Sequence, residues 1–275
     1  MQVTRSLPDL STEYSLTPEQ AESYRANGHV LLRGVCSPEE IAAYRQVLVD
    51  AAKRYNTESR PMEQRDTYAR AFLQIMNLWE NDAECRRFVF AKRFAKVAAD
   101  LMGVDAVRLY HDQALFKEPG GGHTPWHQDQ YYWPLDTNNT VTMWMPLVDA
   151  TEEMGTMTFA SRSHQEGFLG HLEISDESEA KFREFIAGRG YPLNASGAMK
   201  AGDATFHSGW TLHSAPGNAT STTREAMTII FFADGTRLLE PDNKNRWNDL
   251  ERWHPGQKPG ELAGSPLNPV LFSRT

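Results

Sequence analysis

Cysteine is scarce in this chain of 275 residues, which contains only Cys36 and Cys85. The two cysteines do not form a C-x-x-C pair, so they provide neither a disulfide framework nor a thiolate zinc site. Such a pattern is typical of a reducing compartment, because secreted domains use disulfides far more often. We therefore expect the protein to be cytoplasmic.

Long apolar runs and an excess of positive charge are also absent. No apolar stretch typical of a signal peptide occurs in the first residues, MQVTRSLPDLSTEY, and no later run is long enough to span a bilayer. The formal net charge of -8 gives the chain no general attraction to phosphate backbones or anionic lipid. These absences predict a protein without nucleic-acid or membrane partners.

Signals for helices occupy the first part of the chain. Residues 17–20 (TPEQ) and 37–40 (SPEE) each combine a capping residue, a proline at the first helical position and a residue that completes a capping box. Residues 27–28 (NG) should end the first helix, and residues 29–33 follow as a short strand. An apolar stripe predicts a third helix over residues 84–102. Its basic side chains belong to a solvated face or, alternatively, to a phosphate-binding patch.

Short β-type runs separated by turns follow residue 105. The runs cover residues 107–116, 141–148, 156–159, 204–207 and 226–233. Their spacing is typical of a sandwich or jelly roll, and we predict a mainly β fold with flanking α-helices in a single domain. The chain divides into a helical part, a β core and an irregular C-terminal segment, at residues 16–103, 105–235 and 236–275. The last segment is a candidate lid, or it simply packs against the core.

A candidate metal site is centred on the H-x-D sequence His127-Gln128-Asp129. On a strand, residues i and i+2 point to the same side, so both ligands could reach one ion. A distant histidine would complete a facial triad of two histidines and one carboxylate, which leaves three positions on iron open for a cosubstrate and dioxygen. His213 is the preferred third ligand. His207 is the rival, and we interpret it as a structural residue that supports the site.

An arginine in a suitable position accompanies these residues. Arg224 lies eleven residues after His213 and is followed by an apolar run that is predicted to form a strand. A guanidinium group donates two parallel hydrogen bonds to a carboxylate, and an enzyme needs this contact to hold the end of 2-oxoglutarate that is remote from iron. Taken singly, an H-x-D sequence and an arginine at a strand start also fit ordinary structural roles. Together they favour an oxygenase that uses iron and 2-oxoglutarate.

Four ordered segments resemble the phytanoyl-CoA dioxygenase family, over about residues 16–233. They are LTPEQAESYRANGHVLLRGVCSPEEI, LFKEPGGGHTPWHQDQYYWPL, MWMPLVDATEEMGTMTFASRSH and AGDATFHSGWTLHSAPGNATSTTREAM. The resemblance implies a double-stranded β-helix, which is a cupin-like jelly roll, that binds Fe(II) and uses 2-oxoglutarate and O2 as cosubstrates. It also implies that His127, Asp129 and His213 are the iron ligands and that Arg224 binds 2-oxoglutarate.

The resemblance extends to the walls of the cosubstrate pocket. Gln113, Gln128 and Trp144 match positions that line the 2-oxoglutarate pocket in the family. The family more often places a serine two residues after the distal histidine, where this chain has Ala215. Ser214 is therefore the candidate for the missing hydrogen bond to the cosubstrate.

Aromatic residues near the predicted ligands are candidates for the substrate wall. Tyr131, Trp133 and Trp210, together with Tyr132, could surround a mostly apolar small molecule or fill the barrel core. The expected reaction is hydroxylation, or a related oxidation, of a C–H bond of a small organic metabolite, with release of succinate and CO2. The alternatives are acyl-CoA hydroxylation with phosphate contacts at residues 86–96, a cupin-like isomerase or hydrolase that does not use 2-oxoglutarate, and a barrel that only binds a ligand.

Overall fold

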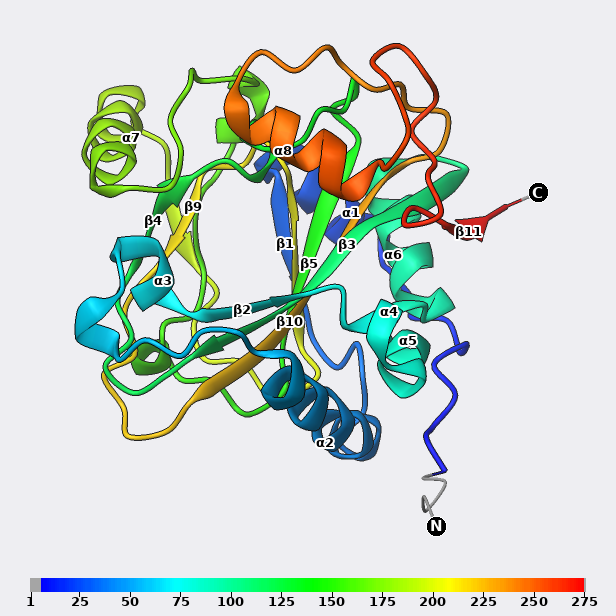
Figure 1. Cartoon of the computed structure of the whole chain (residues 1–275), viewed down its shortest axis with the longest axis vertical. Helices are drawn as coiled ribbons and strands as arrows, with labels where there is room; N and C mark the ends of the chain where they lie inside the picture. The colour runs from blue at the N-terminus through cyan, green and yellow to red at the C-terminus, as the bar shows by residue number, and fades with distance from the viewer. Residues whose placement is uncertain (1–5, 275) are drawn as a thin grey trace.

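The computed structural model describes residues 6–274, and two antiparallel sheets form its core (Figure 1). The larger sheet consists, in spatial order, of β1 (His29–Leu32), β8 (Ala204–Ser208), β5 (Thr140–Pro146), β10 (Arg224–Ala233), β3 (Ala106–Lys117) and β11 (Val270–Ser273), with β2 (Leu73–Met76) paired to β3. The smaller sheet consists of β4 (Thr124–His127), β9 (His213–Ala215), β6 (Thr158–Ala160) and β7 (Leu193–Ala195). This arrangement confirms the predicted jelly-roll fold class.

Helices flank the two sheets. The α-helices of the described residues are α1 (Pro18–Asn27), α2 (Pro38–Tyr55), α3 (Thr67–Ala71), α4 (Leu78–Asn81), α5 (Ala83–Val89), α6 (Lys92–Met102), α7 (Asp176–Arg189) and α8 (Lys244–Trp253). Short 3-10 helices cover Met62–Gln64, Asp129–Tyr131, Glu152–Met154 and Ser163–Glu166. In the described part of the chain, no helix combines the length and apolarity needed to cross a membrane.

The two predicted capping boxes are present and explain where the first helices begin. The Thr17 and Ser37 side chains accept hydrogen bonds from the backbone N–H groups of Gln20 and Glu40, whose side chains bond back to the cap residues. Gly28 ends α1 with φ of 80°, a left-handed conformation that favours glycine.

The predicted helix over residues 84–102 is divided into α5 and α6, which corrects the expectation of one helix. The chain turns at Phe90 and Ala91, where the Ala91 N–H donates to the Phe88 carbonyl at 3.1 Å. No proline or glycine marks this turn in the sequence. Both helices bury their apolar sides in the largest hydrophobic cluster, so tertiary packing favours the break.

Two of the basic side chains on α6 form ion pairs within the helical layer. Arg93 is only 7% exposed, and its guanidinium donates to both carboxylate oxygens of Glu40 at 2.7 and 2.9 Å. Lys96 donates to Asp100 at 2.7 Å. Arg93 therefore holds α6 against α2, and the expected solvated face does not include it.

The side chains of each strand in the larger sheet alternate between a face that helices cover and an inner face. On β10, the side chains of Met227, Ile229 and Phe231 belong to the hydrophobic cluster that includes α2, α5 and α6. Arg224 and Thr228 lie on the opposite face and line a cavity. Successive strand residues point to opposite sides, so the inner face is available for a binding site.

The C-terminal segment contains regular elements, although we expected it to be irregular. Strand β11 pairs with β3, and α8 lies across one end of the sheets (Figure 1). Leu250 and Trp253 of α8 pack in a cluster with Tyr110 and Trp133. Arg246 is the third buried residue of α8. The three buried positions have helical spacing, but one of them is an arginine, so the apolar pattern in the sequence is incomplete.

Candidate active site

A cavity of about 420 Å³ lies between the two sheets. Residues of β4 and β9 line it on the side of the smaller sheet. On the side of the larger sheet, alternate residues line it: His111, Gln113 and Leu115 of β3, Thr142 and Trp144 of β5, and Arg224 and Thr228 of β10. Strand alternation therefore brings segments that are far apart in the sequence to one enclosed space.

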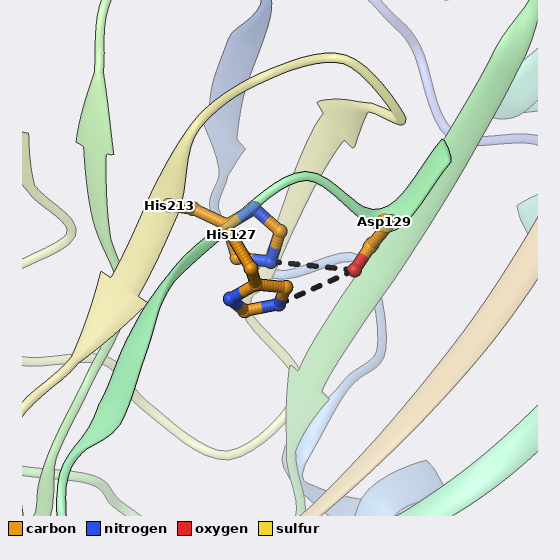
Figure 2. Close-up of side chains that lie close together, drawn as sticks. All are labelled: His127, Asp129 and His213. Atoms are coloured by element: carbon orange, nitrogen blue, oxygen red, sulfur yellow. Dashed lines mark ion pairs between the residues drawn. The ribbon is translucent and has the colours of Figure 1, made fainter. Parts of the chain in front are cut away.

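His127, Asp129 and His213 face one another in this cavity, as Figure 2 shows. His127 ends β4, His213 begins β9, and the two residues are paired in the sheet register. Asp129 Oδ1 lies 3.4 Å from His127 Nε2 and 3.6 Å from His213 Nε2. The ligand atoms of the three residues all lie within 4.8 Å of one another, so these side chains would hold one metal ion.

Asp129 does not lie on a strand, which corrects the predicted geometry. Strand β4 ends at His127, and Asp129 begins a 3-10 helix that runs to Tyr131. The Tyr132 N–H donates to the Asp129 carbonyl at 3.1 Å. This tight turn, rather than strand alternation, brings the carboxylate close to both imidazole rings.

The two histidines are oriented in the same way. His127 Nδ1 lies 2.7 Å from the Pro125 carbonyl oxygen, and His213 Nδ1 lies 2.9 Å from that of Thr211. A carbonyl oxygen only accepts, so each Nδ1 carries the hydrogen and each Nε2 keeps a free lone pair. Burial, with the neighbouring His127 and His207, lowers the pKa of His213 well below its usual range. Two imidazoles held in this orientation beside a carboxylate fit an Fe(II) ion.

The two oxygens of Asp129 have different surroundings. Oδ1 faces the two imidazoles, whereas Oδ2 accepts hydrogen bonds from Thr142 Oγ1 at 2.8 Å and His207 Nε2 at 3.2 Å. Burial raises the pKa of Asp129, but the three neighbouring histidines outweigh burial and hold this pKa well below its usual range. His207 therefore lies behind the carboxylate, and its geometry is that of a supporting residue.

Arg224 is buried in the same cavity without an anionic partner. It is 2% exposed, its guanidinium donates to the Gly155 carbonyl at 2.7 Å, and it lies 5.0 Å from the centre of the Trp144 ring. Its Nε has no hydrogen-bond partner, and no carboxylate of the described residues pairs with it. Burial lowers the pKa of Arg224 to about 9. A buried cation without an anion is costly, so this residue indicates an anionic ligand.

A second buried basic group lies beside Arg224. Lys117 pairs with Arg224 in the register of β3 and β10, is 0% exposed, and donates to the Gly122 carbonyl at 2.6 Å. Burial, with the neighbouring Arg224, lowers the pKa of Lys117 to about 6. The low pKa leaves Lys117 largely uncharged near neutral pH, so Arg224 is the group that makes this end of the cavity favourable for an anion.

The structure brings four of the five predicted 2-oxoglutarate residues to this cavity. Gln113, Trp144 and Ser214 line it together with Arg224, and Gln113 Oε1 accepts a hydrogen bond from Gln74 Nε2 at 2.7 Å. Trp133, one of the predicted substrate residues, also lines the cavity.

The structure does not bring three other predicted residues to the cavity. Gln128 donates through Nε2 to two backbone carbonyls, both at 2.8 Å. The Tyr131 carbonyl accepts from Arg246, and Trp210 Nε1 donates to Asn138 Oδ1 at 2.8 Å. These contacts stabilise the loops around the site, so all three residues have structural partners outside the cavity.

Further lining residues were not predicted from the sequence. They come from the segments around α3 and β2, from β3 and β5, from the loop before α7, and from α8. Thr142 could have been found, because it lies two residues before Trp144 on a predicted strand. No pattern in the C-terminal segment, residues 236–275, indicated which of its residues line the cavity. The additional lining residues include Tyr68, Phe72, Met76, His111, Thr142, Glu173, Asp249, Arg252 and Trp253.

Named relatives share parts of this sequence. The methylphosphonate hydroxylase of Gimesia maris is 28% identical over 151 residues, and the match covers 55% of each chain, so this chain spans about half the length of that relative. Phytanoyl-CoA dioxygenase 1 of Oryza sativa subsp. japonica is 25% identical, over 78% of this chain and 88% of the relative.

Solved structures share the fold. The non-haem α-ketoglutarate-dependent carbocyclase SnoK from nogalamycin biosynthesis superposes with a TM-score of 0.76 at 22% identity, over 97% of this chain and 99% of that one. EctD from S. alaskensis, solved with 2-oxoglutarate and 5-hydroxyectoine, gives a TM-score of 0.67 at 20% identity, over 96% and 92% of the two chains.

The sequence model of the phytanoyl-CoA dioxygenase (PhyH) family matches residues 24–226. The matched region contains the two histidines and the aspartate of Figure 2, as well as Arg224. It agrees with the resemblance that the four sequence segments indicated. The chain therefore belongs to the phytanoyl-CoA dioxygenase family and is a non-haem iron, 2-oxoglutarate-dependent dioxygenase.

Proposed function

We propose that His127, Asp129 and His213 hold Fe(II), that Arg224 binds 2-oxoglutarate, and that the enzyme hydroxylates a C–H bond of a small free metabolite. The observation that carries the proposal is the unpaired guanidinium of Arg224 in the same cavity as the three metal-ligand candidates. A metal triad alone also fits isomerases and hydrolases. The buried cation favours a reaction with an anionic cosubstrate, because such a ligand compensates its charge.

The side chains of the site have separate roles in this reaction. Bound Fe(II) supplies the activation of dioxygen and the oxidation chemistry. Arg224 donates hydrogen bonds to the distal carboxylate of 2-oxoglutarate, and the Trp144 ring under the guanidinium restricts its rotation. Thr142 and His207 hold Oδ2 of Asp129, so that Oδ1 stays directed at the metal position. One 2-oxoglutarate, one O2 and one substrate R–H give succinate, CO2 and R–OH, which balances.

A free small molecule is favoured over an acyl-CoA substrate. The cavity of about 420 Å³ has to accommodate both 2-oxoglutarate and the substrate. The cations that we considered for CoA phosphates lie on α5 and α6, and no residue of these helices lines the cavity. Arg93 and Lys96 are already paired with Glu40 and Asp100. Neither residue is therefore free to bind a phosphate.

Anaerobic titration with Fe(II) and then 2-oxoglutarate tests the proposal. We expect a saturable visible charge-transfer band in the wild type, and succinate release once O2 is admitted. Asp129→Ala should abolish the band, and Arg224→Ala should show little of it at a 2-oxoglutarate concentration that saturates the wild type. Metal binding without saturable 2-oxoglutarate binding would contradict the proposal and favour the isomerase or hydrolase alternative.

A further inference from the structure

One end of the cavity is built by α8, which lies beyond the family match at residues 24–226. His111 marks this end on β3, where it pairs with Ile230, while Arg224 pairs with Lys117 at the other end of the same ladder. The two pairs are six positions apart along β10, which is roughly 20 Å at about 3.4 Å per residue. Arg224 and α8 therefore lie at opposite ends of the binding space.

Asp249 of α8 places a carboxyl group at this end. It lines the cavity, is partly buried, and accepts a hydrogen bond from Tyr110 Oη at 2.7 Å. Its other hydrogen-bond neighbour, Trp253, is also neutral. No cation of the described residues forms an ion pair with Asp249. Burial raises the pKa of this carboxyl to about 7, because it outweighs the hydrogen bond of Tyr110 and the attraction of the more distant Arg252. This carboxyl is the counterpart of Arg224, because each lines the cavity without forming an ion pair.

Two exposed charges of opposite sign lie nearby. Arg252 lines the cavity at the C-terminal turn of α8, and its guanidinium lies over the Trp253 ring, 4.4 Å from the centre. Glu173 also lines the cavity and accepts a hydrogen bond from Asn245 at 3.1 Å. Both side chains are exposed, so water and salt screen them more than they screen Asp249. The buried carboxyl therefore has the larger influence on a ligand in this part of the cavity.

Aromatic rings and a polar atom without a partner surround the carboxyl. Trp133 and Trp253 line this end, and the His111 ring lies 4.9 Å from the Trp253 ring. His111 is 3% exposed, and its Nδ1 has no hydrogen-bond partner. His111 is also near enough to Asp129 to interact with it electrostatically, which joins this end to the metal-ligand candidates. Aromatic faces beside a carboxylate are a favourable environment for an organic cation.

We propose that the substrate of this enzyme carries a protonated amine, which binds to Asp249 between the aromatic rings under α8. The inference rests on the proposed function, since it names the substrate class of the same cavity. An ammonium group donates to the free lone pairs of the Asp249 carboxylate and contacts the faces of Trp133 and Trp253. Its charge compensates that of the carboxylate, which forms no ion pair within the described residues and is attracted only by the exposed Arg252.

Three probes of nearly equal size and different charge test the inference: 2-phenylethylamine, 2-phenylethanol and phenylacetate. Their binding to the anaerobic Fe(II)–2-oxoglutarate enzyme is measured by calorimetry and by the change in the visible band. We expect the amine to bind at least about tenfold more tightly than the alcohol and the acid. Asp249→Asn should reduce this preference to about threefold or less, without changing the affinity for 2-oxoglutarate.

Glu251→Gln is the matched control, because Glu251 is exposed on the same helix, does not line the cavity and loses the same charge. It should keep the wild-type preference. Equal binding of the three probes, tightest binding of phenylacetate, or no binding of any probe to enzyme that binds 2-oxoglutarate would overturn the inference alone. Failure to bind 2-oxoglutarate in the same titration would instead overturn the proposed function. A melting curve of each variant confirms that it is folded.

Discussion

The two ends of the cavity differ in the segments that build them. At one end, Arg224 and Lys117 lie on neighbouring strands of the larger sheet, inside the region matched by the family. At the other end, Asp249 and Trp253 lie on α8, beyond that region. The first end depends on strand alternation in the core, whereas the second depends on one helix outside the matched region. A helix of this kind can change its lining residues without disturbing the sheet, which suits a substrate that differs between relatives.

Both ends of the cavity are expected to act on one metal ion, so loss of a metal ligand should have the largest effect. Asp129→Ala removes one of three candidate ligands, so we expect Fe(II) affinity to fall by well over about 100-fold and turnover to be nearly abolished. Fe(II) titration followed by succinate measurement checks this. Asp242→Ala, an exposed aspartate outside the cavity, is the control and should retain both properties. Retained iron binding by Asp129→Ala would contradict the ligand assignment.

Truncating Arg224 tests the cosubstrate end alone. Removing one partner of a buried, hydrogen-bonded charge pair costs roughly 2 to 5 kcal/mol, so Arg224→Ala should raise the apparent 2-oxoglutarate constant by about 30-fold or more. Iron affinity should stay nearly unchanged, and Arg224→Lys should restore only part of the loss. Succinate release at increasing 2-oxoglutarate provides the measurement. Arg183→Ala, an exposed arginine on α7, is the control, and similar constants for all variants would exclude the role of Arg224.

The supporting hydrogen bonds to Asp129 should have an intermediate effect. Thr142→Val and His207→Ala each remove one of the two bonds to Oδ2, and we expect about a tenfold loss of Fe(II) affinity from either change. Titration of the metal-free protein with Fe(II) gives the value. A loss as large as that of Asp129→Ala for the His207 variant, with little loss for His213→Ala, would show that His207 is the third ligand.

Two neighbouring aromatic residues distinguish the substrate end from the packing around it. Trp133 lines the cavity, whereas Tyr131 does not, although both are buried. Trp133→Ala should reduce substrate oxidation roughly three- to tenfold more than it reduces substrate-independent succinate release. Tyr131→Ala should reduce both activities equally through lower stability. A parallel loss of both activities in the Trp133 variant would mean that this ring only fills the core.

The smallest expected effect concerns the pH dependence of stability at the α8 end. Burial raises the pKa of Asp249 from its ordinary value of 3.8 to about 7, so the folded state keeps this proton longer than the unfolded state does. Stability attributable to Asp249 therefore falls as the pH rises from about 4 to about 7. Between pH 5 and pH 8, Asp249→Asn should gain about 1 kcal/mol relative to the wild type. Denaturant unfolding at both pH values measures the gain, and Glu251→Gln should show none.

Local signals predicted the elements at the start of the chain well. The capping boxes at Thr17 and Ser37 and the glycine at residue 28 depend only on nearby residues, so the sequence contains all the information they need. The division between α5 and α6 has no such signal, because packing against the core selects it. Helix α8 was missed for another reason: it has few buried positions, and one of them is an arginine.

The sequence by itself determined which chemical groups the site contains: two histidines, a carboxylate, and an arginine at the start of the following strand. It also determined the spacing of short strands that is typical of a jelly roll. Only the tertiary structure decided which surfaces these groups face. It places Asp129 in a tight turn, directs Gln128 to backbone carbonyls, leaves Arg224 without an anion and brings Asp249 over the opposite end of the cavity. Burial and the absence of a partner are properties of the packed chain, because they depend on neighbours that are distant in sequence.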